Sequence, residues 1–373
     1  MRPFEPHCPT GPDWTLDWDA TVRGLPWLAE LDGVPQDPVH HAEGDVAVHT
    51  RMAAEALAAD PAWRRLEPAR RLRLFAAVLL HDVGKRDCTV VGDDGRVTAH
   101  GHSRRGELVA RRLLWEAGVP AADREHVAAL IRHHQLPFWA LEREDLDRIV
   151  FASSLTTRND DLAVLARADI TGRICRDAER VLENIALFEE YCDDRGCLDT
   201  PRDFPSDHAR FQYFRTPGRD PGHDAYDDTV CTVTVMSGLP GSGKDTWVAH
   251  HRPDLPVVAL DDIRAELGIH PGENQGPVVA AARERVRVLL RAGTSLVWNA
   301  TTLSRRSRDA VIGLAAAYRA RVEIVAVETT PAELRRRNRD RPDTVPAAVV
   351  ERMLRRWESP DLTEAHRVTR PGA

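Results

Sequence analysis

Residues 232–247 read TVTVMSGLPGSGKDTW, and this stretch decides the fold of the C-terminal part of the chain. A run of apolar, β-forming residues leads into the glycine-rich loop 238–244, and a helical stretch follows it. In this context glycines let backbone N–H groups turn toward phosphate oxygens, and the start of the helix adds partial positive charge. The stretch therefore predicts a nucleotide-binding loop between a strand and a helix.

The rest of the C-terminal part continues the alternation of strand and helix. Short β-rich runs (TVTVMSG, PVVALD, SLVWNA and RVEIVAVE) alternate with helical stretches that begin near residues 243, 277, 304, 331 and 346. Alternation of this kind predicts an α/β domain built on a parallel sheet, with helices on both faces.

The glycine-rich loop predicts a site for ATP or another nucleoside triphosphate with Mg²⁺. Lys244 would bridge the β- and γ-phosphates, and the usual Ser or Thr magnesium ligand is replaced here by Asp245, which Thr246 follows. An Asp oxygen can bind Mg²⁺, but two like charges about 4 Å apart repel by about 4 kcal/mol at an effective dielectric constant of about 20. Direct ligation by Asp245 and a shifted role for Thr246 both stay open. The predicted nucleotide-binding residues are Gly238, Pro240, Gly241, Ser242, Gly243, Lys244, Asp245 and Thr246.

Two further segments could bring charged side chains to this site. Asp261 follows the second β-rich run, where a carboxylate suits a general base for an attacking hydroxyl; capping of the next helix explains it equally well. Five of the seven residues 335–341 are arginine. Such a segment could close over the nucleotide and neutralise a transferring phosphoryl group, or it could be a solvated helix end.

The N-terminal half has a different pattern, because apolar residues recur at helical spacing almost throughout residues 38–192. His81 and Asp82 end the apolar run LFAAVLLHD, where an unpaired buried Asp would be costly. His49 and Asp169 lie on other helical stretches with apolar neighbours. A single histidine of this kind is usually a core residue, but the ordered set predicts a His₂Asp₂ metal centre inside an all-α bundle. Mixed ligation of this type suits Mn²⁺, Ni²⁺, Co²⁺, Fe²⁺ or Zn²⁺ better than Mg²⁺.

Lysine usage marks the same two motifs. Of the 51 Lys and Arg residues only two are lysine, Lys85 in HDVGK and Lys244 in GSGK. We expect lysine to persist where a compact ammonium is needed and a wide guanidinium does not fit. The chain is therefore predicted to carry two sites for phosphate chemistry.

Composition and charge favour two domains without a membrane segment. We predict a metal-site domain over residues 1–192, whose first 35 residues form a cap, a connector over 193–229 and a phosphate-loop domain over 230–373. The net charge is −7, yet residues 230–373 hold 22 Lys and Arg against 17 Asp and Glu. This excess is typical of a domain that binds a polyanion, and a chance imbalance on solvated faces explains it equally well. The six cysteines are scattered and no apolar run approaches the roughly 20 residues that span a bilayer, so we expect reduced thiols and a cytoplasmic location.

Three elements of the C-terminal part resemble the kinase domain of phage and bacterial polynucleotide 5′-kinases. They are GLPGSGKDT (238–246), DDIR (261–264) and RNRDRPDTVP (337–346), and the resemblance covers residues 230–357. It implies that Lys244 holds phosphates and that Asp261 activates the 5′-hydroxyl. It further implies contacts to the substrate or nucleotide from three arginines: Arg264, to the phosphate next to the terminal nucleoside, and Arg337 and Arg341, in the lid. Asp245 departs from the phage pattern.

Residues 38–190 resemble the HD-domain metal phosphohydrolases. His102, in GHSRRG, and His134, in IRHHQ, fall where members with two metals place extra ligands, and the resemblance implies a dinuclear site. Lys85, one turn beyond His81, would meet a substrate phosphate. The metal ligands implied are His49, His81, Asp82, His102, His134 and Asp169, with His133, His100 and His41 as lower-ranked alternatives.

The combination resembles the bacterial HD-domain polynucleotide kinases over nearly the whole chain. It implies a bifunctional enzyme that heals RNA or DNA ends, adding a 5′-phosphate and removing a 2′,3′-cyclic, 2′- or 3′-phosphate before a separate ligase acts. Two alternatives stay open. The chain could join a small-molecule, nucleoside-type kinase to a nucleotide phosphohydrolase, or it could be a nucleotide sensor without turnover.

Overall fold

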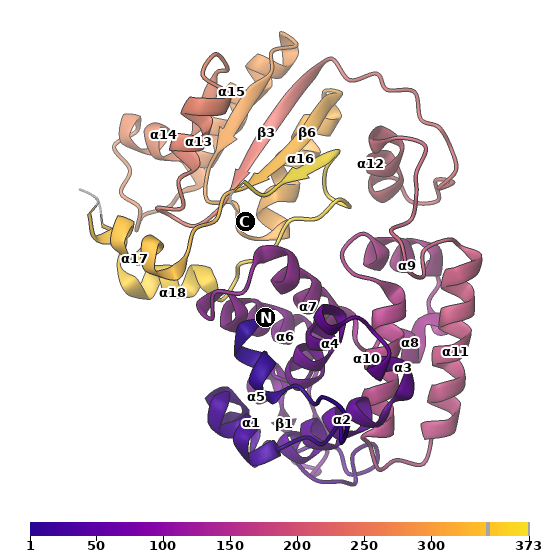
Figure 1. The fold of residues 1–373 in the computed structure, drawn as a ribbon. Coiled ribbons are helices and arrows are strands. Elements are labelled where there is room, and N and C mark those ends of the chain that lie inside the picture. Colours follow the sequence, from indigo (N-terminus) through magenta and orange to yellow (C-terminus); the bar gives the residue numbers. More distant parts are fainter. Residues whose placement is uncertain (341–343, 372–373) are drawn as a thin grey trace. The chain divides into compact units, whose positions relative to one another are not determined.

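The structure is a computed structural model that describes residues 1–340 and 344–371 (Figure 1). The chain divides into two compact units, Met1–Asp203 and Phe204–Ala373. The segment 193–229, expected as a connector, contains the last residues of one helix and all of α12 (Asp207–Arg215).

The first unit is helical apart from one short hairpin, formed by the exposed β1 (Val90–Val91) and the half-buried β2 (Val97–Thr98). Two residues per strand with no buried face leave no periodicity, so the hairpin was not predicted. The helices are η1 (Arg2–His7), α1 (Trp18–Gly24), η2 (Pro26–Leu31), α2 (Val46–Ala59), α3 (Pro61–Arg64), α4 (Pro68–Leu80), α5 (Lys85–Cys88), α6 (His102–Glu116), α7 (Ala121–His133), α8 (Leu136–Trp139), η3 (Ala140–Glu142), α9 (Leu146–Ser154), α10 (Asn159–Thr171) and α11 (Ala178–Asp194).

Helix α4 is the centre of this bundle. Seven consecutive residues, 74–80, are fully buried, so the second half of the helix has no solvent-facing side. It packs against α2, α7 and α10. The residues that directly follow α4 therefore emerge in the interior of the bundle.

The second unit contains a five-stranded parallel sheet in the order β4-β5-β3-β6-β7 (Figure 1). The four predicted strands are present, and a fifth at the edge, β7, was not predicted; it is three residues long and none of them is buried. The elements are α12, β3 (Cys231–Ser237), α13 (Lys244–His251), β4 (Val257–Ala259), α14 (Leu260–Glu266), α15 (Gly276–Arg291), β5 (Leu296–Asn299), α16 (Arg305–Ala317), β6 (Ala320–Ala326), α17 (Pro331–Arg339), α18 (Ala347–Leu354) and β7 (Arg367–Thr369).

Alternate residues of the central strands face opposite sides of the sheet. Val235, Trp298 and Ile324 pair across three strands and pack in the core with α15 and α16. Their neighbours Met236, Val297 and Val325 turn to the other face, where they meet Val248 of α13. Both faces are thus apolar, as expected for strands of a doubly covered parallel sheet.

The order of the strands places the glycine-rich loop. β3 lies between β5 and β6 in the sheet. After β3 the chain passes through α13 to the edge that holds β4 and β5, and it then crosses through α16 to β6 on the opposite side of β3. Connections that diverge from one central strand open a crevice at its carboxyl end. The loop 238–243 follows β3 at this point.

Candidate functional site

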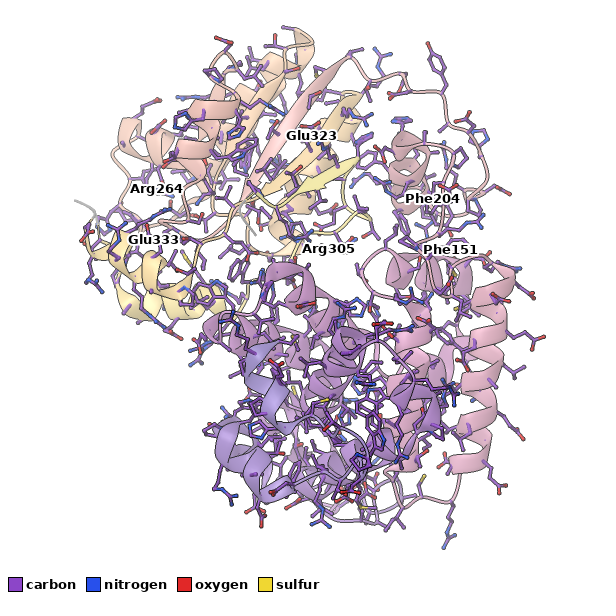
Figure 2. All side chains as sticks on the ribbon, in the orientation of Figure 1. Phe151, Phe204, Arg264, Arg305, Glu323 and Glu333 are labelled. Atoms are coloured by element: carbon purple, nitrogen blue, oxygen red, sulfur yellow. The ribbon has the colours of Figure 1, made fainter. Side chains whose placement is uncertain are left out.

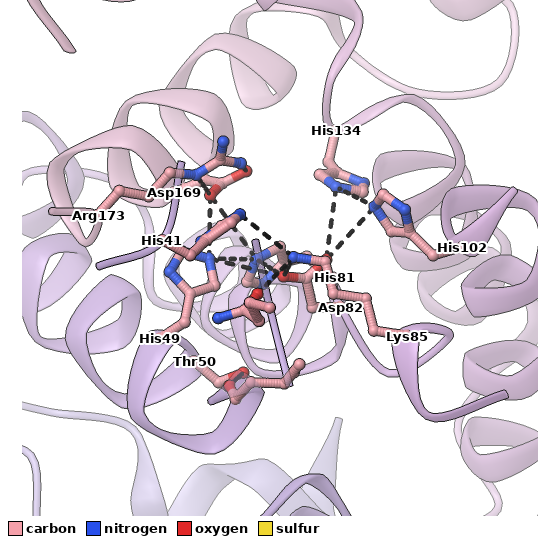
Figure 3. A network of polar contacts seen from close by, with 12 residues as sticks. His41, His49, Thr50, His81, Asp82, Lys85, His102, His134, Asp169 and Arg173 are labelled. Atoms are coloured by element: carbon pink, nitrogen blue, oxygen red, sulfur yellow. Dashed lines mark hydrogen bonds and ion pairs between the residues drawn. The ribbon is translucent and has the colours of Figure 1, made fainter. Parts of the chain in front are cut away.

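Six side chains of the first unit, supplied by five elements, converge in the bundle interior (Figure 3). His81 and Asp82 lie in the turn directly after α4. The other four are His49 in α2, His102 at the start of α6, His134 at the end of α7 and Asp169 in α10. All six are buried, with relative exposures between 0% and 8%.

Two close backbone approaches bring these elements together. A Cβ on Gly84 would lie 2.2 Å from the carbonyl oxygen of His102, so only glycine lets the turn after Asp82 reach α6. A Cβ on Gly172 would lie 2.4 Å from the backbone nitrogen of Ala53 in α2. The end of α10 can therefore approach α2 closely enough to place Asp169 beside His49.

The first group of ligand atoms contains His49, His81 and Asp169. The Nε2 atom of His49 lies 3.1 Å from Nε2 of His81 and 3.1 Å from Oδ1 of Asp169. Oδ2 of Asp82 lies 3.2 Å from Nε2 of His81 and 3.6 Å from Nε2 of His49. Three or four ligand atoms thus surround one point.

The second group shares Asp82. Its other oxygen, Oδ1, lies 3.4 Å from Nε2 of His102 and 3.9 Å from Nε2 of His134. The two imidazole Nε2 atoms are 3.4 Å apart. Figure 3 shows Asp82 between the two groups. One carboxylate with an oxygen in each group has the arrangement that a bridging ligand of two metal ions requires.

The opposite ring nitrogens of the four histidines face oxygen atoms. In three of them Nδ1 donates to the backbone carbonyl three residues earlier in the chain. The pairs are His81 with Val78 (2.7 Å), His102 with Ala99 (2.9 Å) and His134 with Ile131 (2.8 Å). Nδ1 of His49 lies 3.0 Å from Oε1 of Glu43, a contact of hydrogen-bond length but bent geometry. With the proton on Nδ1, each neutral ring turns the lone pair of Nε2 inward.

This donor set fits divalent metal ions. Lone pairs that face each other at 3.1 and 3.4 Å repel unless a cation lies between them. Asp82 is 1% exposed, and within the described residues neither of its oxygens accepts a hydrogen bond of good geometry, although Nζ of Lys85 lies 2.7 Å from Oδ2. Ordered second contacts at Nδ1 are typical of metal-bound histidines.

The pKa shifts agree with such a centre. Burial lowers the pKa of His134 to about 3 and also lowers the pKa of His102, which keeps both rings neutral. Burial alone would raise the pKa of Asp82, but Lys85 and His81 hold it well below its usual range. Burial would likewise lower the pKa of His81, but the two carboxylates outweigh it and raise that pKa. Positive charge is favoured where the ligand atoms meet.

Three nearby residues were not singled out from the sequence. Arg173 donates from Nε and Nη2 to the two oxygens of Asp169, at 2.8 and 2.7 Å, and its spacing of four residues from Asp169 was an available signal. Glu43 and Gln36 lie in the loop before α2 and left no such signal. Of the lower-ranked histidines, His41 contacts Glu43, whereas His100 and His133 belong to none of the metal-type groups of residues 1–340 and 344–371.

In the second unit, Lys244 lies across the glycine-rich loop. Its Nζ donates to the carbonyl oxygens of Gly238 and Leu239, at 3.1 and 3.0 Å. The Oγ atom of Ser242 is buried and has no hydrogen-bond partner among the residues described. Asp245 is exposed and accepts a hydrogen bond of 2.6 Å from Asn299 at the end of β5, and Thr246 is exposed.

Three other predicted kinase residues, Asp261, Arg264 and Arg337, lie on helices. Asp261 is in the first turn of α14, not at the end of β4, and it pairs with Arg264 (labelled in Figure 2), which also donates to Gln275 at 2.8 Å. Arg337 on α17 donates to Glu333 at 2.5 Å and to the carbonyl of Ser242 at 3.3 Å, so α17 reaches the glycine-rich loop. Arg341 lies outside the described residues.

Two family models match the chain, one in each unit. Residues 45–173 match the HD domain, and residues 233–360 match a model described as an AAA domain. The first unit holds a helical HD domain. The second carries a P-loop on a five-stranded parallel sheet. An HD domain implies binding of divalent metal, and a P-loop domain implies a nucleotide with Mg²⁺.

Known relatives match only part of the chain. It is 38% identical over 123 residues to the Multifunctional CCA protein of Halorhodospira halophila, covering 33% of this chain and 27% of that protein. It is 40% identical over 116 residues to the A-adding tRNA nucleotidyltransferase of Deinococcus radiodurans, covering 30% of this chain and 25% of that protein. The chain thus spans about a quarter of the length of these relatives.

Among solved structures, a sugar kinase from Janibacter sp. HTCC2649 matches 38% of this chain and 85% of its own, at 21% identity and a TM-score of 0.29.

None of the helices within the described ranges combines the length and apolar composition needed to cross a bilayer.

Proposed function

We propose that the chain is a bifunctional enzyme that heals nucleic-acid ends. The C-terminal domain would transfer the γ-phosphate of a nucleoside triphosphate to a 5′-hydroxyl end, and the HD domain would remove a 2′,3′-cyclic, 2′- or 3′-phosphate. Breakage by transesterification leaves one end short of a phosphate and the other with a surplus phosphate. Two separate sites on one chain suit that pair of products, and one similar protein is named as an A-adding tRNA nucleotidyltransferase.

The observation that carries the phosphatase half is the convergence of four imidazole lone pairs on the unsatisfied carboxylate of Asp82. His49, His81 and Asp169 would hold one ion, His102 and His134 a second, and Asp82 would bridge them. Divalent ions at these positions supply a hydroxide at neutral pH and hold the oxygens of an in-line displacement. Lys85 would offer its ammonium to the substrate phosphate, and Arg173 holds Asp169 in place.

The kinase half rests on the place of Lys244 and the loop 238–243 at the carboxyl end of the central strand. Lys244 would exchange its two loop carbonyls for phosphate oxygens. Asp261 would accept the proton of the attacking 5′-hydroxyl, and Arg264 would contact the adjacent phosphate of the polynucleotide. Arg337 and Arg341 would neutralise the transferring phosphoryl group.

Two single variants test the assignment of separate sites. Lys244→Ala should abolish labelling of a 5′-hydroxyl oligonucleotide and leave phosphate release from a 2′,3′-cyclic end unchanged. Asp82→Ala should have the opposite effect. Loss of both activities from either folded variant would show that the two reactions do not have separate sites.

A further inference from the structure

One buried carboxylate in the first unit connects a proposed metal ligand to two other parts of the same site. Glu43 lies in the loop before α2, and its side chain is fully shielded from solvent. Oε1 lies 2.9 Å from Nδ1 of His41 and 3.0 Å from Nδ1 of His49. Oε2 accepts a 2.9 Å hydrogen bond from the backbone N–H of Ile174.

These contacts dictate the tautomers of both histidines. A carboxylate in the ionised form only accepts, so the nitrogens that face it carry the protons. The backbone N–H of Ile174 can only donate to Oε2, so Glu43 turns acceptor oxygens to all three of these neighbours. His41 and His49 are therefore both held with Nδ1 protonated and Nε2 free to accept.

The two free Nε2 atoms have different neighbours. That of His49 faces His81 and Asp169, as described above for the metal centre. That of His41 lies 3.4 Å from Nζ of Lys85. The two rings meet edge to face with centroids 4.8 Å apart, so they form one wall of the site.

His41 completes a cage around the Lys85 ammonium. An ammonium has three N–H donors. Nζ of Lys85 contacts three acceptors, at 2.7 Å from Oδ2 of Asp82, 2.6 Å from Oε1 of Gln36 and 3.4 Å from Nε2 of His41. Lys85 is 6% exposed, so its charge stays beside Asp82. The contact to His41 is the longest of the three and the easiest to exchange for a substrate oxygen.

We propose that Glu43 is a positioning residue that fixes two tautomers through one oxygen, presenting His49 to the metal and His41 to Lys85. It follows that His41 is not a metal ligand, although His41, Glu43 and His49 by themselves form a group with metal-type spacing. This assignment rests on the metal centre of the proposed function. Through this carboxylate, the loop of residues 36–43 couples metal binding to the position of the Lys85 ammonium, which would meet the substrate phosphate.

Glu43→Gln is the most direct test of this role. The amide has only one acceptor oxygen, so it cannot accept hydrogen bonds from His41, His49 and the backbone of Ile174 together. If its oxygen faces the two histidines, its N–H₂ group meets the N–H of Ile174; if it faces Ile174, the histidines must move their protons to Nε2. Loss of such a second contact typically weakens metal binding by about 10- to 100-fold. We expect that loss in Mn²⁺ titration calorimetry of the full chain. His41→Phe should bind Mn²⁺ within about 3-fold of the wild type with unchanged stoichiometry.

A matched control is Glu189→Gln, which breaks a surface pair with Arg167 in the same unit and should leave Mn²⁺ binding unchanged. Unaltered Mn²⁺ affinity of folded Glu43→Gln would overturn the role of Glu43. Loss of one ion per chain in His41→Phe would instead make His41 a ligand.

A second measurement needs no variant. Proton-detected ¹⁵N spectra of histidine-labelled, metal-free protein should show His41 and His49 both protonated at Nδ1, and protonation of either at Nε2 would refute the proposal. Failure of the wild type to bind Mn²⁺ would overturn the metal centre, whereas the tautomers would still report on Glu43 alone.

Discussion

Replacement of Gly172 by alanine tests whether the close approach of α10 to α2 sets the geometry of the metal site. The glycine has φ −80°, a conformation that alanine adopts freely, so the backbone accepts the change. The added Cβ, however, would lie 2.4 Å from the nitrogen and 2.5 Å from the Cα of Ala53. Relief of this overlap to an ordinary carbon contact of about 3.5 Å requires the two helices to separate by about 1 Å.

That displacement acts directly on two proposed ligands. Asp169 precedes Gly172 by three residues on α10, and His49 precedes Ala53 by four on α2, so the 3.1 Å separation of their ligand atoms grows with the helix separation. Metal–ligand distances tolerate only about 0.2 Å. We expect Gly172→Ala to lower the free energy of unfolding by about 1–3 kcal/mol and phosphatase activity by about 100-fold, with kinase activity unchanged.

The measurements are urea unfolding, Mn²⁺ titration and phosphate release from a 2′,3′-cyclic oligonucleotide. Gly313→Ala on α16 is the control, because the nearest atom to its added Cβ is the flexible end of Arg215 at 3.4 Å. That change should be neutral or stabilise the helix by up to about 1 kcal/mol. Wild-type Mn²⁺ affinity and stability in Gly172→Ala would refute the idea that this contact places Asp169.

Three other predictions follow from single side chains. Arg173→Met leaves Asp169 buried without its cation and should lower the free energy of unfolding, measured in urea, by about 3–5 kcal/mol. The control Arg180→Met removes an ion pair with Asp177 in which the arginine is 58% exposed, and it should lower the free energy of unfolding by less than about 1 kcal/mol. Arg264→Ala should raise KM for a 5′-hydroxyl oligonucleotide at least tenfold and spare a free nucleoside acceptor; an equal loss with both acceptors would favour the small-molecule alternative. His366 has a pKa lowered from 6.5 to about 4 because it is buried, and its Nδ1 accepts from Val322 N–H at 3.0 Å. Between pH 4 and pH 6.5 the unfolded chain therefore binds more protons at His366 than the folded chain does. The contribution of His366 to the free energy of unfolding is present above pH 6.5 and is lost as the pH falls toward 4, with a loss of about 2 kcal/mol at pH 5. Calorimetry should find a smaller loss between pH 7 and pH 5 in His366→Phe, and an identical loss would rule out His366 as the source.

Some of the candidate site was visible in the sequence because its signals are local. A strand, a glycine-rich loop and a helix in direct succession place Lys244 at the carboxyl end of β3, and the structure has this order. His81 and Asp82 stood out because they directly follow an apolar run, which becomes the fully buried half of α4. The structure brings these two residues together with His49, His102, His134 and Asp169. The catalytic and ligand roles assigned to them stay predictions.

Other parts could not be read from the sequence. Asp261 follows β4 as the sequence predicts, but it lies in the first turn of α14, where it pairs with Arg264 one turn away. Glu43 is one acidic residue in a loop, and its neighbours in sequence give it no pattern. Its function as a shared acceptor arises only when the loop, α2 and the segment that follows α10 pack together.

The sequence by itself determined the architecture of each half and the chemical types at each site, because periodicity, glycine placement and buried ionisable residues are properties of neighbouring positions. Only the tertiary structure decided which atoms meet. The division of Asp82 between two groups, the proton positions on His41 and His49 and the cage around Lys85 depend on contacts between residues up to 131 positions apart. Such contacts are set by helix packing, and no local pattern encodes them.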